Sequence, residues 1–226
     1  MADSRMTGIL SALEVESDII LKEMTGTEVS VIAGMTFTRG YIHDRKAVLA
    51  TCGVSKVNAA LFTQIMIDHF RPDCILFTGV AGSMDPSVKQ MDLVVADKLT
   101  FHDVDPHQLE FCFPNQVWFR TDERLTELIC QSAEGPISGA IITGDQFITS
   151  REQKKKLKKR FPEALAVEME GCAVAQTCCV NQVPFAVIRC ISDLADNKAE
   201  DSYDAFEKKA AEKSASVILK TICDMQ

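Results

Sequence analysis

The sequence predicts an α/β fold, a three-layer αβα sandwich in which helices cover both faces of a mixed, twisted sheet. Short apolar runs of strand length alternate with longer stretches of helical periodicity over most of the 226 residues. This alternation is typical of α/β domains. Three apolar or alternating runs also follow one another between residues 29 and 52 with no helix between them. They predict a meander, so we expect a mixed sheet and not a purely parallel one.

Apolar periodicity and turn residues predict the individual elements. The expected strands cover residues 6–12, 29–31, 36–42, 47–52, 73–78, 91–97, 99–101, 137–143, 164–168 and 185–191. The expected helices cover residues 14–24, 55–69, 122–132, 151–160, 169–180 and 203–223, with Ser55 as the N-cap of the second. Between these elements, residues 79–82 predict a tight turn where backbone can approach a ligand. Residues 102–115 predict an irregular loop, and long loops in compact domains are often functional.

Composition and charge restrict the class of protein. Residues 1–226 suit a single domain, and 46% hydrophobic and 25% charged residues are ordinary for a soluble globular protein. The net charge of −8 disfavours a nucleic-acid partner. We expect a cytoplasmic protein with no membrane partner, because no signal-peptide pattern and no apolar run of about 18 residues occurs. The nine cysteines form no Cys-x-x-Cys pair, which favours reduced thiols.

Several motifs with known chemistry are absent or weak. The chain contains no Gly-x-Gly-x-x-Gly, no phosphate-binding loop and no Gly-x-Ser-x-Gly. Residues 102–107 hold two imidazoles and two carboxylates, but their spacing matches no ligand pattern, so we expect neither a metal nor a cofactor. The basic run from Lys154 to Arg160 is better explained by a solvated helix face than by nucleic-acid binding, given the net charge.

Acidic residues lie at the ends of two buried strands, where ligands bind in open α/β sheets. Glu168 and Glu170 are separated by one residue, so an extended backbone would point both to the same side. Asp193 follows Ser192 at the end of the next strand. Buried acids are costly unless they are paired or hydrogen-bonded. There are two simpler alternatives to a binding site. Glu168 and Glu170 could be solvated at the strand end, and Asp193 could be a helix N-cap.

Two further charged positions need an explanation. Glu16 lies at the start of the first helix, where the helix dipole alone favours an acid. Arg189 lies within an otherwise apolar strand, so its guanidinium is expected to be paired. Glu16, Glu168 or Glu170 could each be its partner.

Four motifs taken together carry a family resemblance. They are Ser11–Glu16, Thr143–Ile148, Ala166–Glu170 and Arg189–Asp196. In this order the set resembles the 5′-methylthioadenosine/S-adenosylhomocysteine nucleosidases of the nucleoside phosphorylase superfamily, from Gly8 to the final helix. The resemblance implies irreversible hydrolysis of the N-glycosidic bond of these nucleosides, and of 5′-deoxyadenosine, with release of adenine and a 5-thioribose.

The resemblance also implies residue roles. Glu16 would be the general base that activates water, and Asp193 the acid that protonates the five-membered ring of the departing adenine. Protonation of such a leaving group contributes a factor of roughly 10² to 10⁴ in rate. Asp193 must therefore be protonated near neutrality, and we expect burial and neighbouring carboxylates to raise its pKa. Arg189 would fix Glu16 and the water. The implied substrate-binding residues are Gly82, Phe147, Ile148, Glu168, Met169, Glu170, Arg189 and Ser192.

The adenine nucleoside is the expected small-molecule partner, and a second copy of the chain is the expected protein partner. In the family the loop that holds Pro106, Leu109 and Phe111 lines the 5′-alkylthio pocket, partly across a dimer interface. Three positions depart from the family pattern: Ser55 and Ser83 replace glycines, and Val80 replaces a small hydroxyl residue and would remove a polar contact.

Three other functions stay open. A phosphorylase of the same superfamily needs an arginine-rich phosphate site, whereas the turn from Ser11 to Glu14 carries an acid that would repel phosphate. A futalosine-type nucleosidase uses a similar site. A non-catalytic nucleoside-binding protein would bind without turnover.

Overall fold

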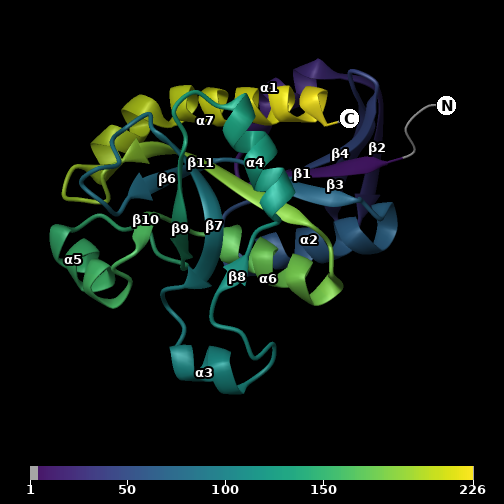
Figure 1. The fold of residues 1–226 in the computed structure, drawn as a ribbon. Coiled ribbons are helices and arrows are strands. Elements are labelled where there is room, and N and C mark those ends of the chain that lie inside the picture. Colours follow the sequence, from purple (N-terminus) through teal and green to yellow (C-terminus); the bar gives the residue numbers. More distant parts are fainter. Residues whose placement is uncertain (1–4, 226) are drawn as a thin grey trace.

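In the computed structural model, which describes residues 5–225, eleven strands form a mixed sheet with helices on both faces (Figure 1). The strands are β1 (Met6–Ser11), β2 (Met24–Ile32), β3 (Met35–Ile42), β4 (Arg45–Thr51), β5 (Cys74–Phe77), β6 (Val80–Ser83), β7 (Leu93–Phe101), β8 (Phe119–Arg120), β9 (Ile137–Thr143), β10 (Ala164–Glu168) and β11 (Phe185–Asp193). The helices are α1 (Glu14–Glu23), α2 (Lys56–Phe70), α3 (Pro106–Phe111), α4 (Glu123–Ser132), α5 (Arg151–Arg160), α6 (Gly171–Asn181) and α7 (Ala199–Asp224).

The predicted α/β sandwich is confirmed. The strand order is β2-β3-β4-β1-β5-β11-β6-β10-β9-β7-β8, and β2, β3 and β4 form the expected antiparallel meander. The centre is mostly parallel: β1, β5 and β11 run side by side in the same direction. Because β7 pairs with both β9 and β11, the strands β11, β6, β10, β9 and β7 close on themselves.

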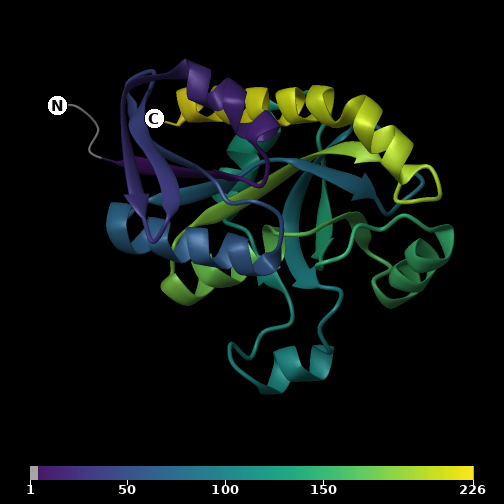
Figure 2. The same ribbon diagram turned by 180° about the vertical axis from the view of Figure 1, so that it is seen from behind.

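The core lies on both faces of the sheet because successive strand residues point to opposite sides. In β1, Leu10 faces the side covered by α2 and α6, whereas Ile9 faces the side covered by α1, α4 and α7. The long helix α7 runs along the second face, and α3 projects from the opposite side of the molecule on two extended segments (Figures 1 and 2). The buried strands are thus apolar on both faces, as the sequence predicts.

Four predictions about elements are wrong in detail. Residues 79–82 do not form a tight turn, because Val80–Ser83 is the strand β6, which pairs with both β10 and β11. The two strands expected at 91–97 and 99–101 are the single strand β7, whose irregularity between Ala96 and Lys98 interrupts the apolar pattern. The first helix ends at Glu23, since Met24 already begins β2. The loop at 102–115 contains the short helix α3, capped by Asp105.

Candidate active site

A cavity opens to solvent at the carboxyl ends of β1, β10 and β11. Such strand ends are where open α/β sheets bind ligands. Nine of the ten site residues predicted from the sequence line it: Glu16, Gly82, Phe147, Ile148, Glu168, Met169, Glu170, Ser192 and Asp193. The tenth, Arg189, is 1% exposed and lies behind the lining. Glu16 and Asp193, 177 residues apart in the chain, therefore share one cavity.

The strand β6 brings the two acid-bearing strands together. Gly82 is paired with Asp193 of β11 on one side and with Val167 of β10 on the other. A Cβ atom on Gly82 would lie 2.9 Å from Asp193 Oδ1 and 3.1 Å from the Ala195 Cβ. Glycine is required at this position because any larger side chain would displace the Asp193 carboxyl group.

Glu16 is buried in the first turn of α1, at 2% exposure, and backbone groups hold its carboxylate. The amides of Ala12 and Leu13 donate to Oε2 at 2.8 and 2.9 Å, and the amide of Val80 donates to Oε1 at 3.0 Å. Burial raises the pKa of Glu16, while Arg189 and the three amides oppose this rise. A carboxylate held in this way is oriented, and its raised pKa makes it a stronger base than an exposed glutamate.

Gly79 lets Glu16 and Arg189 approach the same stretch of backbone. A Cβ atom there would lie 2.6 Å from Glu16 Oε1 and 3.0 Å from Arg189 Nη1. The residue also has a φ of +156°, which L side chains rarely adopt. The two charged groups therefore lie close together at Gly79 without a direct hydrogen bond between them in this structure.

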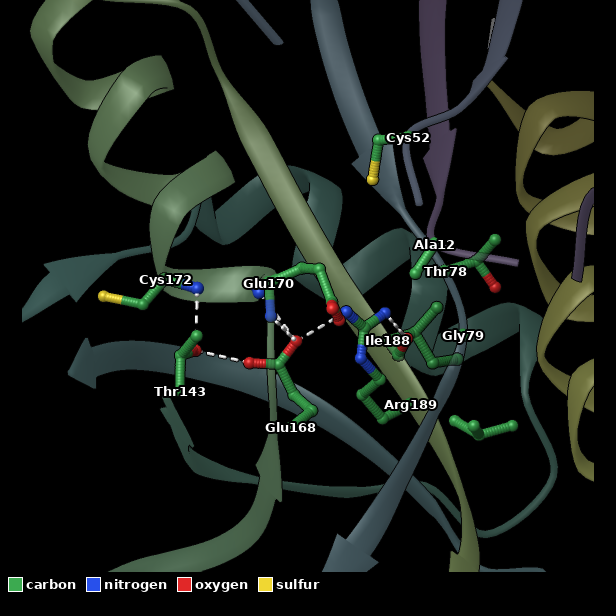
Figure 3. A network of polar contacts seen from close by, with 12 residues as sticks. Ala12, Cys52, Thr78, Gly79, Thr143, Glu168, Glu170, Cys172, Ile188 and Arg189 are labelled. Carbon is green, nitrogen blue, oxygen red and sulfur yellow. Dashed lines mark hydrogen bonds and ion pairs between the residues drawn. The ribbon is translucent and has the colours of Figure 1, made fainter. Parts of the chain in front are cut away.

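The ion-pair partner of Arg189 is Glu168 and not Glu16 (Figure 3). Arg189 Nη2 lies 2.8 Å from Glu168 Oε2, and the guanidinium stacks over the Phe77 ring at 4.0 Å. Glu168 also accepts hydrogen bonds from the Thr143 hydroxyl and from the amides of Glu170 and Gly171. Protein donors thus occupy both carboxylate oxygens of Glu168, which fixes the turn that carries Glu170.

Glu170 lies at the start of α6, 5% exposed, and accepts a hydrogen bond from the Ser55 amide at 3.0 Å. Burial and the adjacent Glu168 raise the pKa of Glu170 to about 8. Ser55 caps α2 as predicted, its hydroxyl accepting from the Asn58 amide. Its φ of +118° is a backbone conformation that glycine adopts far more readily than other residues.

Asp193 is 1% exposed, and both of its oxygens have a partner. The Ser192 hydroxyl donates to Oδ2 at 2.9 Å, and the Ala195 amide donates to Oδ1 at 2.8 Å. Burial raises the pKa of Asp193, and Asp196 adds to this rise, whereas the two hydrogen bonds and Lys154 oppose it. The direction is the one that a general acid working near neutrality requires.

Tyr203 also lines the cavity, and nothing in the sequence indicated this role, since Tyr203 was expected only as the first residue of the last helix. Its ring meets Phe147 edge-on with the centroids 5.5 Å apart. Its hydroxyl donates to Glu207 one turn further along α7 at 2.6 Å. Tyr203 and Phe147 together form an aromatic wall of the cavity.

The projecting segment lies outside the cavity. Pro106, Leu109 and Phe111 belong to α3, and none of these three lines the cavity of its own chain. Phe111 and Phe113 are 63% and 76% exposed. Within residues 5–225 no cluster of three or more potential metal-binding side chains occurs, and no helix there has the length and apolar character needed to span a membrane.

The sheet order and the cavity at its strand ends define the class of protein. The chain belongs to the phosphorylase superfamily, whose family model matches residues 7–222.

More particular similarities point to nucleosidases. A 5′-methylthioadenosine/S-adenosylhomocysteine nucleosidase of Staphylococcus aureus (strain JH9) is 38% identical over 221 residues, 94% of this chain and 97% of that protein. The Neisseria meningitidis nucleosidase of the same name, solved with methylthio-immucillin-A, superimposes with a TM-score of 0.94 at 33% identity, covering 98% of this chain and 100% of that one. A futalosine hydrolase of Helicobacter pylori gives a TM-score of 0.92 at 36% identity, covering 98% of each chain.

Proposed function

We propose that this protein hydrolyses the N-glycosidic bond of 5′-methylthioadenosine and S-adenosylhomocysteine, and also of 5′-deoxyadenosine. The products are adenine and the corresponding ribose, a 5-thioribose for the two thioethers. The observation that carries the proposal is the single cavity shared by a buried, oriented glutamate and a buried aspartic acid with a raised pKa. The named relatives support the choice of nucleosides.

Glu16 acts as the general base and Asp193 as the general acid. Glu16 takes a proton from water as the water oxygen bonds to the anomeric carbon. Asp193 gives its proton to the five-membered ring of adenine as the glycosidic bond breaks and its electrons pass to the base. Both carboxyl groups also favour the positive charge that develops on the sugar in an oxocarbenium-like transition state.

The other lining residues hold the two halves of the substrate. Glu170 accepts hydrogen bonds from the ribose hydroxyls, and Met169 packs against the sugar. Phe147 stacks on adenine, while the backbone of Ile148 recognises the edge of the base. Gly82 brings main chain to the substrate, as the resemblance implies.

Glu168 and Arg189 act indirectly in this proposal. Their ion pair and the further hydrogen bonds of Glu168 hold the two side chains to each other and to the backbone, and Arg189 does not line the cavity. Arg189 instead places a positive charge behind Glu16, and Glu168 fixes the turn before α6. The resemblance implies a substrate-binding role for both residues, and we propose this indirect role beside it.

Water is favoured over phosphate as the attacking group. Of the described residues that line the cavity, four are Glu or Asp and none is Lys or Arg. This lining offers a phosphate dianion no cationic side chain to bind, whereas a neutral water molecule can be activated by Glu16. Phosphorolysis is therefore disfavoured.

The exposed Phe111 and Phe113 on and beside α3 support a homodimer. We place this dimer in the cytoplasm, as the sequence predicts. In that dimer α3 of one copy would approach the cavity of the other and complete its 5′-alkylthio side. Light scattering on the wild-type chain and on the double variant F111D/F113D tests this: we expect a dimer and a monomer, respectively.

Adenine release tests the main proposal. Methylthioadenosine, S-adenosylhomocysteine, 5′-deoxyadenosine, adenosine and a futalosine analogue are offered with and without phosphate. We expect release from the first three at rates independent of phosphate, and incorporation of ¹⁸O from labelled water at the anomeric carbon. Rates that require phosphate would identify a phosphorylase, and binding without release would identify a nucleoside-binding protein. Preferential cleavage of the futalosine analogue would favour the activity of the Helicobacter relative.

A further inference from the structure

The basic helix α5 contacts the loop that follows Asp193. Lys154 Nζ donates to the Leu194 carbonyl at 2.7 Å, and the Arg151 amide donates to the Asn197 side chain at 3.1 Å. Arg151 Nε also lies 3.8 Å from Asp196 Oδ2. The run of lysines and arginines is thus more than a solvated face, because its first turn holds residues 194–197.

The contact made by Lys154 reaches the proposed acid through one peptide group. The carbonyl of Leu194 and the amide of Ala195 belong to the same planar unit. Lys154 binds the carbonyl, and the amide of that unit donates to Asp193 Oδ1 at 2.8 Å. A cation on the carbonyl oxygen polarises the peptide and strengthens its N–H as a donor.

The backbone around this peptide adopts an uncommon conformation. Ala195 has a φ of +48°, in the left-handed region that costs a non-glycine residue free energy, and it is fully buried. Such a conformation persists only where surrounding contacts hold it. Lys154 supplies one of those contacts from outside the loop, and Gly82 leaves the space for the Ala195 Cβ.

We propose that Lys154 is a positioning residue for Asp193: it orients and polarises the Leu194–Ala195 peptide so that its amide stabilises the carboxylate formed when Asp193 gives up its proton. This role rests on the proposed function. It concerns the chemical step and not the binding of the nucleoside, since Lys154 does not line the cavity.

The charges around Asp193 determine the sign of the expected pH effect. Lys154 lowers the pKa of Asp193, and Asp196 raises it. From the cavity side, the other carboxyl groups in the lining are Glu16, Glu168 and Glu170, and burial raises the pKa of Glu16 and of Glu170. Lys154 itself is also close to Asp85 and Lys158. Loss of the Lys154 charge therefore raises the pKa of Asp193, which stays protonated to higher pH.

The test compares K154M with K155M, which removes the same charge from an exposed neighbour on the same helix. We expect K154M to lower kcat about fivefold, a factor that corresponds to the free energy of one partly exposed ionic contact. KM should stay within twofold of wild type, and the alkaline limb of the kcat profile should move to higher pH. K155M should match wild type, and K154R, which keeps a charged donor, should recover most of kcat.

A second readout needs no turnover. The Asp193 carboxyl group is titrated by ¹³C NMR in wild type, K154M and K155M, and is assigned by its loss in D193N. A higher pKa in K154M alone supports the proposal. Identical Asp193 titrations in K154M and K155M would overturn it. A wild-type protein that releases no adenine would instead overturn the proposed function, while the titration still decides the role of Lys154.

Discussion

Replacing Asp193 with asparagine removes a proton from the site and leaves its geometry in place. The asparagine oxygen can accept the Ala195 amide, which donates to Asp193 Oδ1 at 2.8 Å. The asparagine NH₂ group can donate to the Ser192 hydroxyl, which lies 2.9 Å from Asp193 Oδ2. Since the side chain is 1% exposed, no water can replace the lost proton donor easily. D193N should therefore fold normally and fail in the chemical step.

The size of the loss follows from the leaving group. General-acid catalysis contributes roughly 10² to 10⁴ in rate, which is about 3 to 5 kcal/mol in the activation barrier. We expect kcat for methylthioadenosine to fall by this factor and KM to change by less than about threefold, because the cavity keeps its shape.

The assay follows adenine release from methylthioadenosine and, in parallel, 4-nitrophenolate release from the matching 5-methylthioribosyl ether. 4-Nitrophenolate departs without protonation, so D193N should cleave the ether nearly as fast as the wild type does. Thermal unfolding of both proteins controls for misfolding. A D193N variant that keeps more than a tenth of kcat, or that loses activity equally on both substrates, would refute the assignment of Asp193.

Three further predictions concern the rest of the cavity. E16Q should lower kcat at least about a hundredfold. It should also reduce the free energy of unfolding, measured by urea denaturation, by about 1–3 kcal/mol, because glutamine has one acceptor oxygen for the three backbone amides that Glu16 accepts from. F147A should raise KM by about fivefold to a hundredfold through lost stacking and leave kcat nearly unchanged, seen in steady-state kinetics. The raised pKa of Glu170 means that the folded protein binds this proton more tightly, so stability should fall as pH rises from about 4.5 towards about 8. E170Q should flatten that fall in urea melts by at most about 1.4 kcal/mol per pH unit, and an unchanged slope would contradict the shift.

Much of the fold could be predicted because the physical signals are local. The strands β1, β9 and β11 lie in largely apolar runs, and the basic helix α5 has the predicted bounds, residues 151–160. The strand β6 was missed because Gly79 directly before it and Gly82 within it are typical of a turn. Pairing with neighbours far away in the chain decides its conformation, and local propensity does not record those neighbours.

The site shows the same division. Acids at the ends of buried strands, and an arginine inside one, can be recognised in the sequence. Buried charges are unfavourable unless they are paired or hydrogen-bonded, so their presence there indicates a site. The choice of Glu168 over Glu16 as the partner of Arg189 was not visible, and neither was the aromatic wall completed by Tyr203.

The sequence by itself determined the class of fold, the order of most of its elements and nine of the eighteen residues that line the cavity. Only the tertiary structure decided how these side chains are paired, which peptide holds Asp193 and which charge lies behind it. The physical reason is distance along the chain: Lys154 and Leu194 are 40 residues apart, and Glu16 and Val80 are 64 apart. Contacts of this kind depend on the strand order and on where each helix packs, and no local pattern encodes them.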